Sequence, residues 1–581
     1  MPKPPPVISE RVDDIPLLIE QMHHMDLASL IDQHFIPHGN WEGLSPGQLS
    51  VLWLTYILSE GDHRLNQVEA WVLDHRLTLQ SCLAPAVRRL DASDDHLAHL
   101  LELLGEDAAW IAFEQACAQT LIRTYALDSR VARVDTTTAS GYGQVTPDGI
   151  FQFGHSKDHR PDLPQVKINL ATLDPLGLPL VTQVWPGQTG DDPLYIPAIQ
   201  QVQAGLQQTG LTHIGDSKMG ALATRAYVQQ SGDYYLLPLG LVQLSAAAID
   251  AHLAPVWRDQ QPLTPVYRPP AQAGERREKI AEGFEWVERL TATVDGQPCR
   301  WPERRFLLRS FSYATAQEKA LRARLAQAQQ ALEALNQRGR GHSRYPLQAP
   351  LQEAAQALLT SQQVEGLLKV TYAARHTVRS VRAYGTRPAR RAQTTDYFVR
   401  VAINTPAVTR VIRRLGWRVY ATNHPKRALS LAQAVDAYRH QYLEERGFGR
   451  LKGRLLALSP LYLSNERRVT GLIRLLSLGL RVLTLVEFEV RRQLQTLHAD
   501  LAGLHAGQPK RTTAHPTTEQ LLHAFKGLTL TVWRTGNAWQ AHLPALSLLQ
   551  RRISKLLKFP ATLYSRLERQ SFELAPKMGE P

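Results

Sequence analysis

Four side chains with chemically useful groups recur in the segment Ala437–Gly453, which reads AYRHQYLEERGFGRLKG. They are Tyr438, Gln441, Glu445 and Lys452, with two, three and six residues between successive members. At about 100° per residue, a continuous α-helix would project all four from one face within a wedge of about 60°. A phenol, an amide, a carboxylate and an ammonium make a poor core face. The stripe is therefore predicted to be either solvated or part of a site.

Two aspartates stand near the ends of predicted strands, from which their carboxylates can converge with that of Glu445. Asp135 lies in RVARVDTTTASG, near the end of the first β-like run, and Asp216 lies in LTHIGDSKMGA, at the end of the fourth, where a helix begins. Enzymes hold Mg²⁺ with few carboxylates, together with waters and substrate phosphates. Two such ions about 3.5–4 Å apart activate the attacking oxygen and stabilise the leaving oxygen in phosphoryl transfer. The three acids therefore predict a site for two Mg²⁺ ions, with Mn²⁺ as a substitute, in a nuclease or strand-transfer enzyme.

Each acid has an ordinary alternative when it is taken singly. An Asp between a strand and a helix is more often a helix N-cap or a turn residue. Glu445 follows Glu444 in an arginine-rich helix, where a solvated ion pair is the default. Asp174 in DPLG, and Asp191 and Asp192 in GQTGDDP, are also acids in turns. We expect none of these three to be a metal ligand.

The charge balance favours a polyanionic partner. The chain has 66 basic and 53 acidic residues, a net charge of +13, and such an excess is typical of proteins that bind nucleic acid. The polar loop SKDHRPD leaves two interpretations open, because Lys157 and Arg160 can either contact DNA or pair with acids of the same loop.

Cysteine content and hydropathy bear on location. The three cysteines have no metal-ligand spacing and fit a reducing, cytoplasmic setting. The longest apolar stretch, Val469–Val490, carries Arg474 and Arg481 in its middle. Charges there favour a buried helix over a membrane span, so no membrane partner is expected.

The residue types and their hydrophobic periodicity change four times along the chain. These changes predict a multidomain α/β protein. Helical periodicity dominates the start, and short β-branched runs with two helical runs follow. A β-rich basic block with one long helix comes next, and Asp295–Gly296 is its expected hairpin turn. A strand and an apolar helix then precede a linker and a small basic module. The expected boundaries are 1–127, 128–243, 244–415, 416–497 and 498–581.

The spacing of Tyr438, Gln441, Glu445 and Lys452 resembles the Y-(2)-R-(3)-E-(6)-K signature of one large branch of bacterial insertion-sequence DDE transposases, with Gln441 where the signature has Arg. GHSKDHRPDLPQVKINLATLDPLGLPL resembles the segment after the first catalytic Asp in one subgroup of that branch, and IGDSKMGA resembles the segment around the second. The helical start resembles the N-terminal domain of the same subgroup. The resemblance implies an RNase H-like catalytic core, interrupted by an insertion domain between the second Asp and the Glu.

The resemblance also implies roles for the residues that match. Asp135, Asp216 and Glu445 would hold the metal pair, and Lys452 would contact a phosphate near the cleaved bond. Tyr438 would position the DNA backbone, and Gln441 would make a neutral contact where Arg usually stands.

The implied reaction is cut-and-paste transposition in the bacterial cytoplasm, on the element's terminal repeats and target DNA. A homodimer is expected in the DNA complex, because two ends must be brought together. Two alternatives remain open at this point: a nuclease that does not join ends, and a transposase-derived DNA-binding protein without catalysis.

Overall fold

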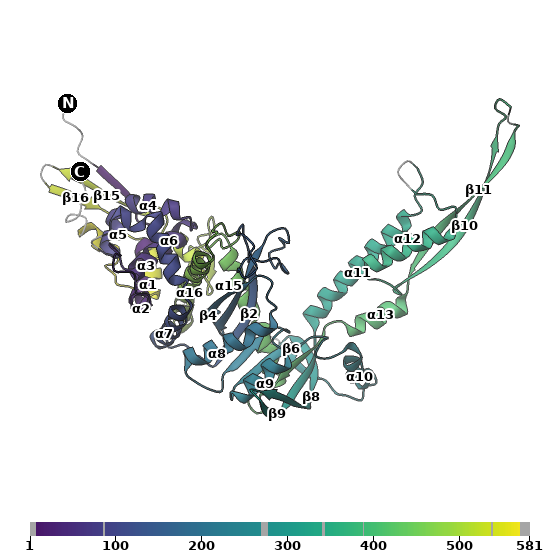
Figure 1. The fold of residues 1–581 in the computed structure, drawn as a ribbon, viewed down its shortest axis with the longest axis horizontal. Helices are drawn as coiled ribbons and strands as arrows, with labels where there is room; N and C mark the ends of the chain where they lie inside the picture. The colour runs from purple at the N-terminus through teal and green to yellow at the C-terminus, as the bar shows by residue number, and fades with distance from the viewer. Residues whose placement is uncertain are drawn as a thin grey trace.

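The computed structural model describes residues 7–84, 87–268, 277–339, 343–386, 388–535 and 538–569. Its centre is a nine-stranded mixed sheet in the order β4-β3-β2-β5-β6-β12-β9-β8-β7 (Figure 1). The strands are β2 (Val131–Ser140), β3 (Gln165–Leu173), β4 (Leu178–Pro186), β5 (Thr212–Gly215), β6 (Tyr234–Leu239), β7 (Thr264–Tyr267), β8 (Lys279–Val294), β9 (Gln297–Ser310) and β12 (Trp417–Thr422). This large mixed sheet confirms the α/β class. Its assignment to the RNase H-like fold stays a prediction.

The first half of the sheet follows the predicted order of elements. β2, β3 and β4 form an antiparallel meander. α8 (Tyr195–Leu206) and α9 (Leu222–Gln230) then alternate with β5 and β6, which run parallel to β2 and to each other. Every residue of β3 is buried, as expected for a strand covered on both faces. Asp135 is not near the end of its strand as predicted, because pairing with β3 continues to Ser140.

The predicted insertion is only partly a separate body. β8 and β9 join at Asp295 and Gly296, which both have positive φ, as the predicted tight turn requires. β9 then pairs with β12, so this meander extends the central sheet. The rest forms an arm that projects away from the sheet (Figure 1). It contains α11 (Phe311–Ala334), α12 (Gln348–Ser361), β10 (Leu368–Val381), β11 (Arg390–Ile403) and α13 (Thr405–Arg414), and α10 (Ala246–Trp257) lies near its base.

A long apolar helix joins the sheet to the N-terminal helices. α16 (Glu466–Thr496) has the length and composition of a membrane span, yet 94% of its most apolar window is buried inside the described protein. It packs against α6, α3 and β4. The predicted buried helix is therefore confirmed. The N-terminal helices are α1 (Ile15–His24), α2 (Leu27–His34), α3 (Pro46–Glu60), α4 (Leu65–Asp74), α5 (Arg76–Cys82), η1 (Arg89–Ala92), α6 (Asp94–Leu104) and α7 (Asp107–Tyr125).

The expectation that the first 127 residues are helical throughout is wrong at one place. Val7–Arg11 forms β1, which pairs antiparallel with β15 (Thr529–Thr535), and β16 (Ala538–His542) completes this sheet. The two strands are far apart in the sequence, so no local sequence pattern predicts their pairing. The C-terminal part also contains β13 (Leu501–Ala502), β14 (Thr512–Thr513), α17 (Thr518–His523) and α18 (Leu548–Leu556). Its apolar residues share one core with the N-terminal helices, α16 and the first half of the sheet.

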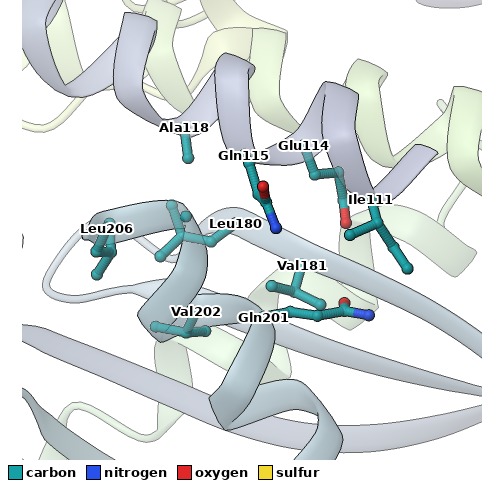
Figure 2. A pocket seen from close by; sticks show the side chains of 10 residues that line it. Ile111, Glu114, Gln115, Ala118, Leu180, Val181, Gln201, Val202 and Leu206 are labelled. Atoms are coloured by element: carbon teal, nitrogen blue, oxygen red, sulfur yellow. The ribbon is translucent and has the colours of Figure 1, made fainter. Parts of the chain in front are cut away.

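A tight seam shows how the N-terminal helices meet the sheet (Figure 2). Side chains of α7, α8 and β4 enclose a hollow of about 10 Å³, room for one water at most. Glu114 of α7 lies at this seam. It accepts a hydrogen bond from the Thr182 amide (3.0 Å) and forms an ion pair with the buried Arg481 of α16. Burial raises the pKa of Glu114, and the Arg481 guanidinium opposes that rise. The hollow is a packing seam rather than a binding pocket.

Candidate functional site

Asp135 and Asp216 come from neighbouring strands of the central sheet. Val134 of β2 pairs with Gly215 at the end of β5. The residue that follows each of them along the chain is an aspartate. Burial raises the pKa of Asp135 to about 6; the Lys157 ammonium opposes this rise and the Asp216 carboxylate adds to it. The predicted convergence of these two acids is present in the structure.

One oxygen of each aspartate is held by the protein. The Thr136 amide donates to Asp135 Oδ1 (2.7 Å). The Tyr195 hydroxyl (2.6 Å) and the Lys218 amide (2.7 Å) donate to Asp216 Oδ1. Tyr195 is buried at the start of α8, and burial, followed by the charges of Asp216, Asp135 and Asp191, raises the pKa of its phenol. Sequence reasoning missed Tyr195, because a tyrosine at the start of an amphipathic helix resembles an ordinary core residue.

Lys157 lies against the strand that carries Asp135. Its Nζ donates to the Thr136 carbonyl (2.6 Å) and hydroxyl (2.7 Å), and it lies 3.7 Å from Asp191. Asp191 is itself paired with Lys167 at 2.6 Å. The loop thus delivers a cation to the site, and the DNA contact predicted for Lys157 stays a prediction.

Arg160, in the same loop, pairs with its near neighbour. Its Nε and Nη2 donate to the Asp162 carboxylate at 2.9 and 2.7 Å, and both side chains are exposed. Of the two interpretations of this loop, pairing within it is the one seen for Arg160.

The signature segment is not one continuous helix. α14 (Leu431–Arg439) has its C-cap at His440, and α15 (Tyr442–Lys452) begins after Gln441. Amides of residues 440, 441, 443 and 444 bond to carbonyls three residues earlier, as in a 3₁₀ turn. Such a turn advances about 120° per residue rather than about 100°. The prediction that one continuous α-helix projects all four signature residues within a wedge of about 60° is therefore wrong.

Arg133 ties this helix junction to the sheet. It is fully buried in β2, and its Nε donates to Asp174 Oδ1 at 2.7 Å. It also donates to the Ala437 carbonyl and to Gln441 Oε1 (3.3 Å). Because side chains two residues apart on a strand share a face, Asp135 faces the same junction. Asp174 is thus the ion-pair partner of Arg133, and its exclusion as a metal ligand stays a prediction.

Gln441 connects Arg133 to the acid pair at the start of α15. Its Nε2 donates to Glu444 Oε2 at 2.6 Å, so both ends of its amide are engaged within the protein. Tyr438 packs against Tyr420 with ring centroids 4.6 Å apart. Burial raises the pKa of its phenol, and the Asp216 and Asp135 charges contribute. The DNA contacts predicted for Tyr438 and Gln441 stay predictions.

Glu444 and Glu445 occupy opposite environments in the first turn of α15. Glu444 is 3% exposed, and its Oε1 has no hydrogen-bond partner among the described residues. Burial, followed by the Asp135 charge, raises its pKa well above the usual range. Glu445 is exposed to solvent. Within the described ranges, no group of three His, Cys, Asp or Glu side chains is gathered tightly enough to hold a metal ion, so the third ligand stays a prediction.

Lys452 ends α15 with its ammonium on Asp158. Asp158 also accepts from the Ser140 amide (2.9 Å) and from the Ser459 hydroxyl (3.1 Å). Burial would raise the pKa of Asp158, but the Lys452 hydrogen bond and charge lower it below its usual value. α15 continues through Gly447 and Gly449, so Lys452 stays in register with Glu445, about 20° away around the helix.

Comparisons with known proteins return distant structural likeness alone. No family model and no curated protein matches the chain. Among solved structures, the piggyBac transposase synaptic complex with hairpin DNA aligns at 9% sequence identity with a TM-score of 0.24. The alignment covers 51% of this chain and 58% of that one, less than two thirds of its length. At this score, the likeness carries no argument about the fold or activity of this chain.

Proposed function

We propose that this chain is a metal-dependent DNA transposase of the DDE type. It would cut the ends of a mobile element and join the freed 3′-OH ends to target DNA. The observation that carries the proposal is the placement of Asp135 and Asp216 side by side, with the pKa of Asp135 raised to about 6. Two partly buried carboxylates side by side repel each other unless a cation lies between them. The signature spacing and the net charge of +13 add support.

The two aspartates suit Mg²⁺ in donor type. Both offer hard carboxylate oxygens, which Mg²⁺ prefers. In each aspartate, Oδ1 accepts a hydrogen bond from the protein. These hydrogen bonds leave Oδ2 of each aspartate available to a metal ion. When bound, the metal pair supplies activation of the attacking oxygen and neutralises charge on the leaving oxygen. Lys157 sets the charge balance around Asp135, and Tyr195 fixes the orientation of Asp216.

The third ligand is proposed to be Glu445 rather than Glu444. Glu445 lies at the solvent edge of α15, where a DNA phosphate and hydrated ions have access. Glu444 is buried and accepts a hydrogen bond from Gln441. These features suit an uncharged side chain that links α15 to β2. Lys452, on the same side of α15 as Glu445, would exchange the Asp158 carboxylate for a DNA phosphate.

The chemistry is two transfers at phosphorus. In cutting, a water oxygen bonds to phosphorus while the bond to the 3′ oxygen breaks, and that oxygen takes up a proton. In joining, the 3′-OH loses its proton as its oxygen bonds to a target phosphorus, and the target's own 3′ oxygen leaves. In both transfers, hydrogen bonds from the protein hold the two aspartate carboxylates in place. The junction between α14 and α15 keeps its orientation, and a basic side chain binds the phosphate.

The proposal is tested by cleavage of a supercoiled plasmid that carries the element's ends, with Mg²⁺ or Mn²⁺. We expect metal-dependent cutting at the ends by the unchanged protein, and no cutting by Asp135→Asn or Asp216→Asn although both still bind DNA. Pre-cut ends offered with target DNA then separate joining from hydrolysis alone. DNA binding without cutting by the unchanged protein would support the alternative of a non-catalytic DNA-binding protein.

The assignment of the third acid is tested by a matched pair of variants. Glu445→Gln should lower the cleavage rate by roughly a hundredfold or more, because a metal ligand is lost. Glu444→Gln should leave the rate within about tenfold, because glutamine has the shape of the uncharged acid that burial favours. Initial cleavage rates at saturating Mg²⁺ measure both. The opposite ranking would make Glu444 the ligand.

A further inference from the structure

The arm ends in a two-stranded ribbon that has its own anchor and a free outer half. β10 and β11 pair antiparallel over their whole length, from Leu368–Ile403 to Val381–Arg390. At the inner end, Leu368 and Val399 are buried in a separate apolar cluster with residues of α11, α12 and α13. Figure 1 shows the outer end extending beyond α12, far from the central sheet. Among the described residues, the apolar contacts of the ribbon with the rest of the arm thus lie in its inner half.

The outer half is exposed on both faces. From Ala374 to Val381 every residue of β10 is exposed, including Val378 at 61%, and Arg390 and Arg391 on the opposing strand are exposed as well. An isolated two-stranded ribbon is marginally stable in water. Seven pairs, from Arg375 to Val381 on β10, span roughly 23 Å. A feature of this length with both faces bare suits a binding partner that surrounds it.

The charge of the outer half specifies the chemistry of that partner. Residues 375–395 contain six arginines and neither Asp nor Glu. The five that the structure describes, Arg375, Arg379, Arg382, Arg390 and Arg391, form no ion pair with any described residue. The nearest acid, Asp396, is already paired with Arg344 at 3.1 Å. These cations are available for an external polyanion, whereas two such ribbons would repel each other.

The register distributes the cations over both faces. Directly opposed residues share a face, and Val381 opposes Arg390 while Ser380 opposes Arg391. Arg375, Arg379 and Arg390 therefore lie on one face, and Arg391 lies on the other. A flat anionic surface would engage one face alone. A groove with an anionic wall on each side engages both.

We infer that residues 375–386 and 388–395 insert into the major groove of duplex DNA. That groove is about 12 Å wide, admits a two-stranded β-ribbon and is bordered by two phosphate backbones. Arg375, Arg379 and Arg390 would face one backbone, and Arg391 the other. The inference rests on the proposed function for the identity of the nucleic acid, and it adds where and how the duplex is held.

The test compares two charge-matched triple variants of the full chain. The ribbon variant is Arg375→Gln, Arg379→Gln and Arg390→Gln. The control variant is Arg258→Gln, Arg289→Gln and Arg300→Gln, which removes three exposed arginines outside the ribbon. Circular dichroism establishes that both fold. Affinity for a duplex is measured by fluorescence anisotropy over a range of salt concentrations.

We expect the ribbon variant to bind duplex DNA at least about tenfold more weakly at about 0.1 M salt, with the slope of log K against log salt reduced by about 2–3. The control variant should show a clearly smaller loss. The unchanged protein should protect guanine N7, a major-groove atom, from dimethyl sulfate, and the ribbon variant should lose this protection. Duplex RNA has a deep and narrow major groove that does not admit the ribbon. Its affinity for the unchanged protein and for the ribbon variant should therefore be the same.

Three results would overturn the inference: equal losses in the two variants, guanine N7 protection that survives in the ribbon variant, or a ribbon variant changed only in oligomeric state by sedimentation. The last result would make the ribbon a contact between copies of the chain. Failure of the proposed function looks different. In that case the unchanged protein binds DNA through the ribbon but does not cut it with Mg²⁺. Conversely, a ribbon variant that cuts at high protein concentration separates DNA holding from catalysis.

Discussion

Single residues account for most of the chemistry at the proposed site. Asp135 lies in the middle of a strand, where a carboxylate is costly unless a cation is nearby. The Lys157 ammonium favours the charged form of Asp135, and the Asp216 carboxylate disfavours it. The two aspartates could be predicted from sequence, because each follows an apolar β-like run. Arg133 and Tyr195 could not, since their partners Asp174, Gln441 and Asp216 are brought to them only by the fold.

The raised pKa of Asp135 predicts how the metal requirement depends on pH. A proton competes with Mg²⁺ for this carboxylate below about pH 6, rather than below the usual value near 4 for aspartate. The Mg²⁺ concentration for half-maximal cleavage should therefore rise about tenfold for each unit that pH falls below about 6. Mg²⁺ titrations of the initial rate between about pH 5 and pH 8 measure this. A requirement that stays constant down to about pH 5 would contradict it.

At the scale of elements, α15 illustrates what a local pattern can and cannot establish. Its extent through two glycines to Lys452 agrees with the periodicity, and the Asp295–Gly296 hairpin was readable from turn chemistry. The break between α14 and α15 was not readable, because neither Pro nor Gly occurs there. Arg133, from another element, binds the Ala437 carbonyl and the Gln441 side chain at that break.

Gly449 offers a test of how α15 is stabilised. It lies within the helix, and a Cβ added there meets nothing within 4 Å. Gly449→Ala should therefore stabilise the protein by up to about 1 kcal/mol, since alanine is the better helix former. Thermal unfolding measures the shift. Gly453→Ala is the control, because its Cβ would lie 2.6 Å from the Gly449 carbonyl oxygen, and it should destabilise. A lower melting temperature for Gly449→Ala would show that its flexibility is used in the fold.

At the scale of the whole molecule, one buried ion pair joins the helical part to the sheet. Arg481 of α16 contacts Glu114 of α7 and the Pro179 carbonyl of β4 (2.8 Å). Arg481→Met should lower the free energy of unfolding by about 3–5 kcal/mol, because Glu114 is left buried without its partner. Adding Glu114→Gln should recover most of this loss. Urea unfolding followed by circular dichroism measures both.

The matched control is an exposed pair on the arm. Arg322 and Glu318 lie four residues apart on α11, at 2.6 Å. Arg322→Gln should change the free energy of unfolding by no more than about 0.5 kcal/mol. An equally small effect of Arg481→Met would mean that the helical part and the sheet do not depend on this pair.

The pairing of β1 with β15 has a consequence for biosynthesis. β1 leaves the ribosome long before β15, the strand with which it pairs, and the N-terminal helices share their core with both α16 and the C-terminal part. At roughly 5–20 residues per second, the ribosome needs on the order of tens of seconds to deliver those later segments. Throughout that time the apolar surface that these helices later bury against α16 and the C-terminal part has no partner. The β1–β15 sheet can therefore form only late in synthesis, and a chaperone that shields nascent chains should raise the yield of folded protein.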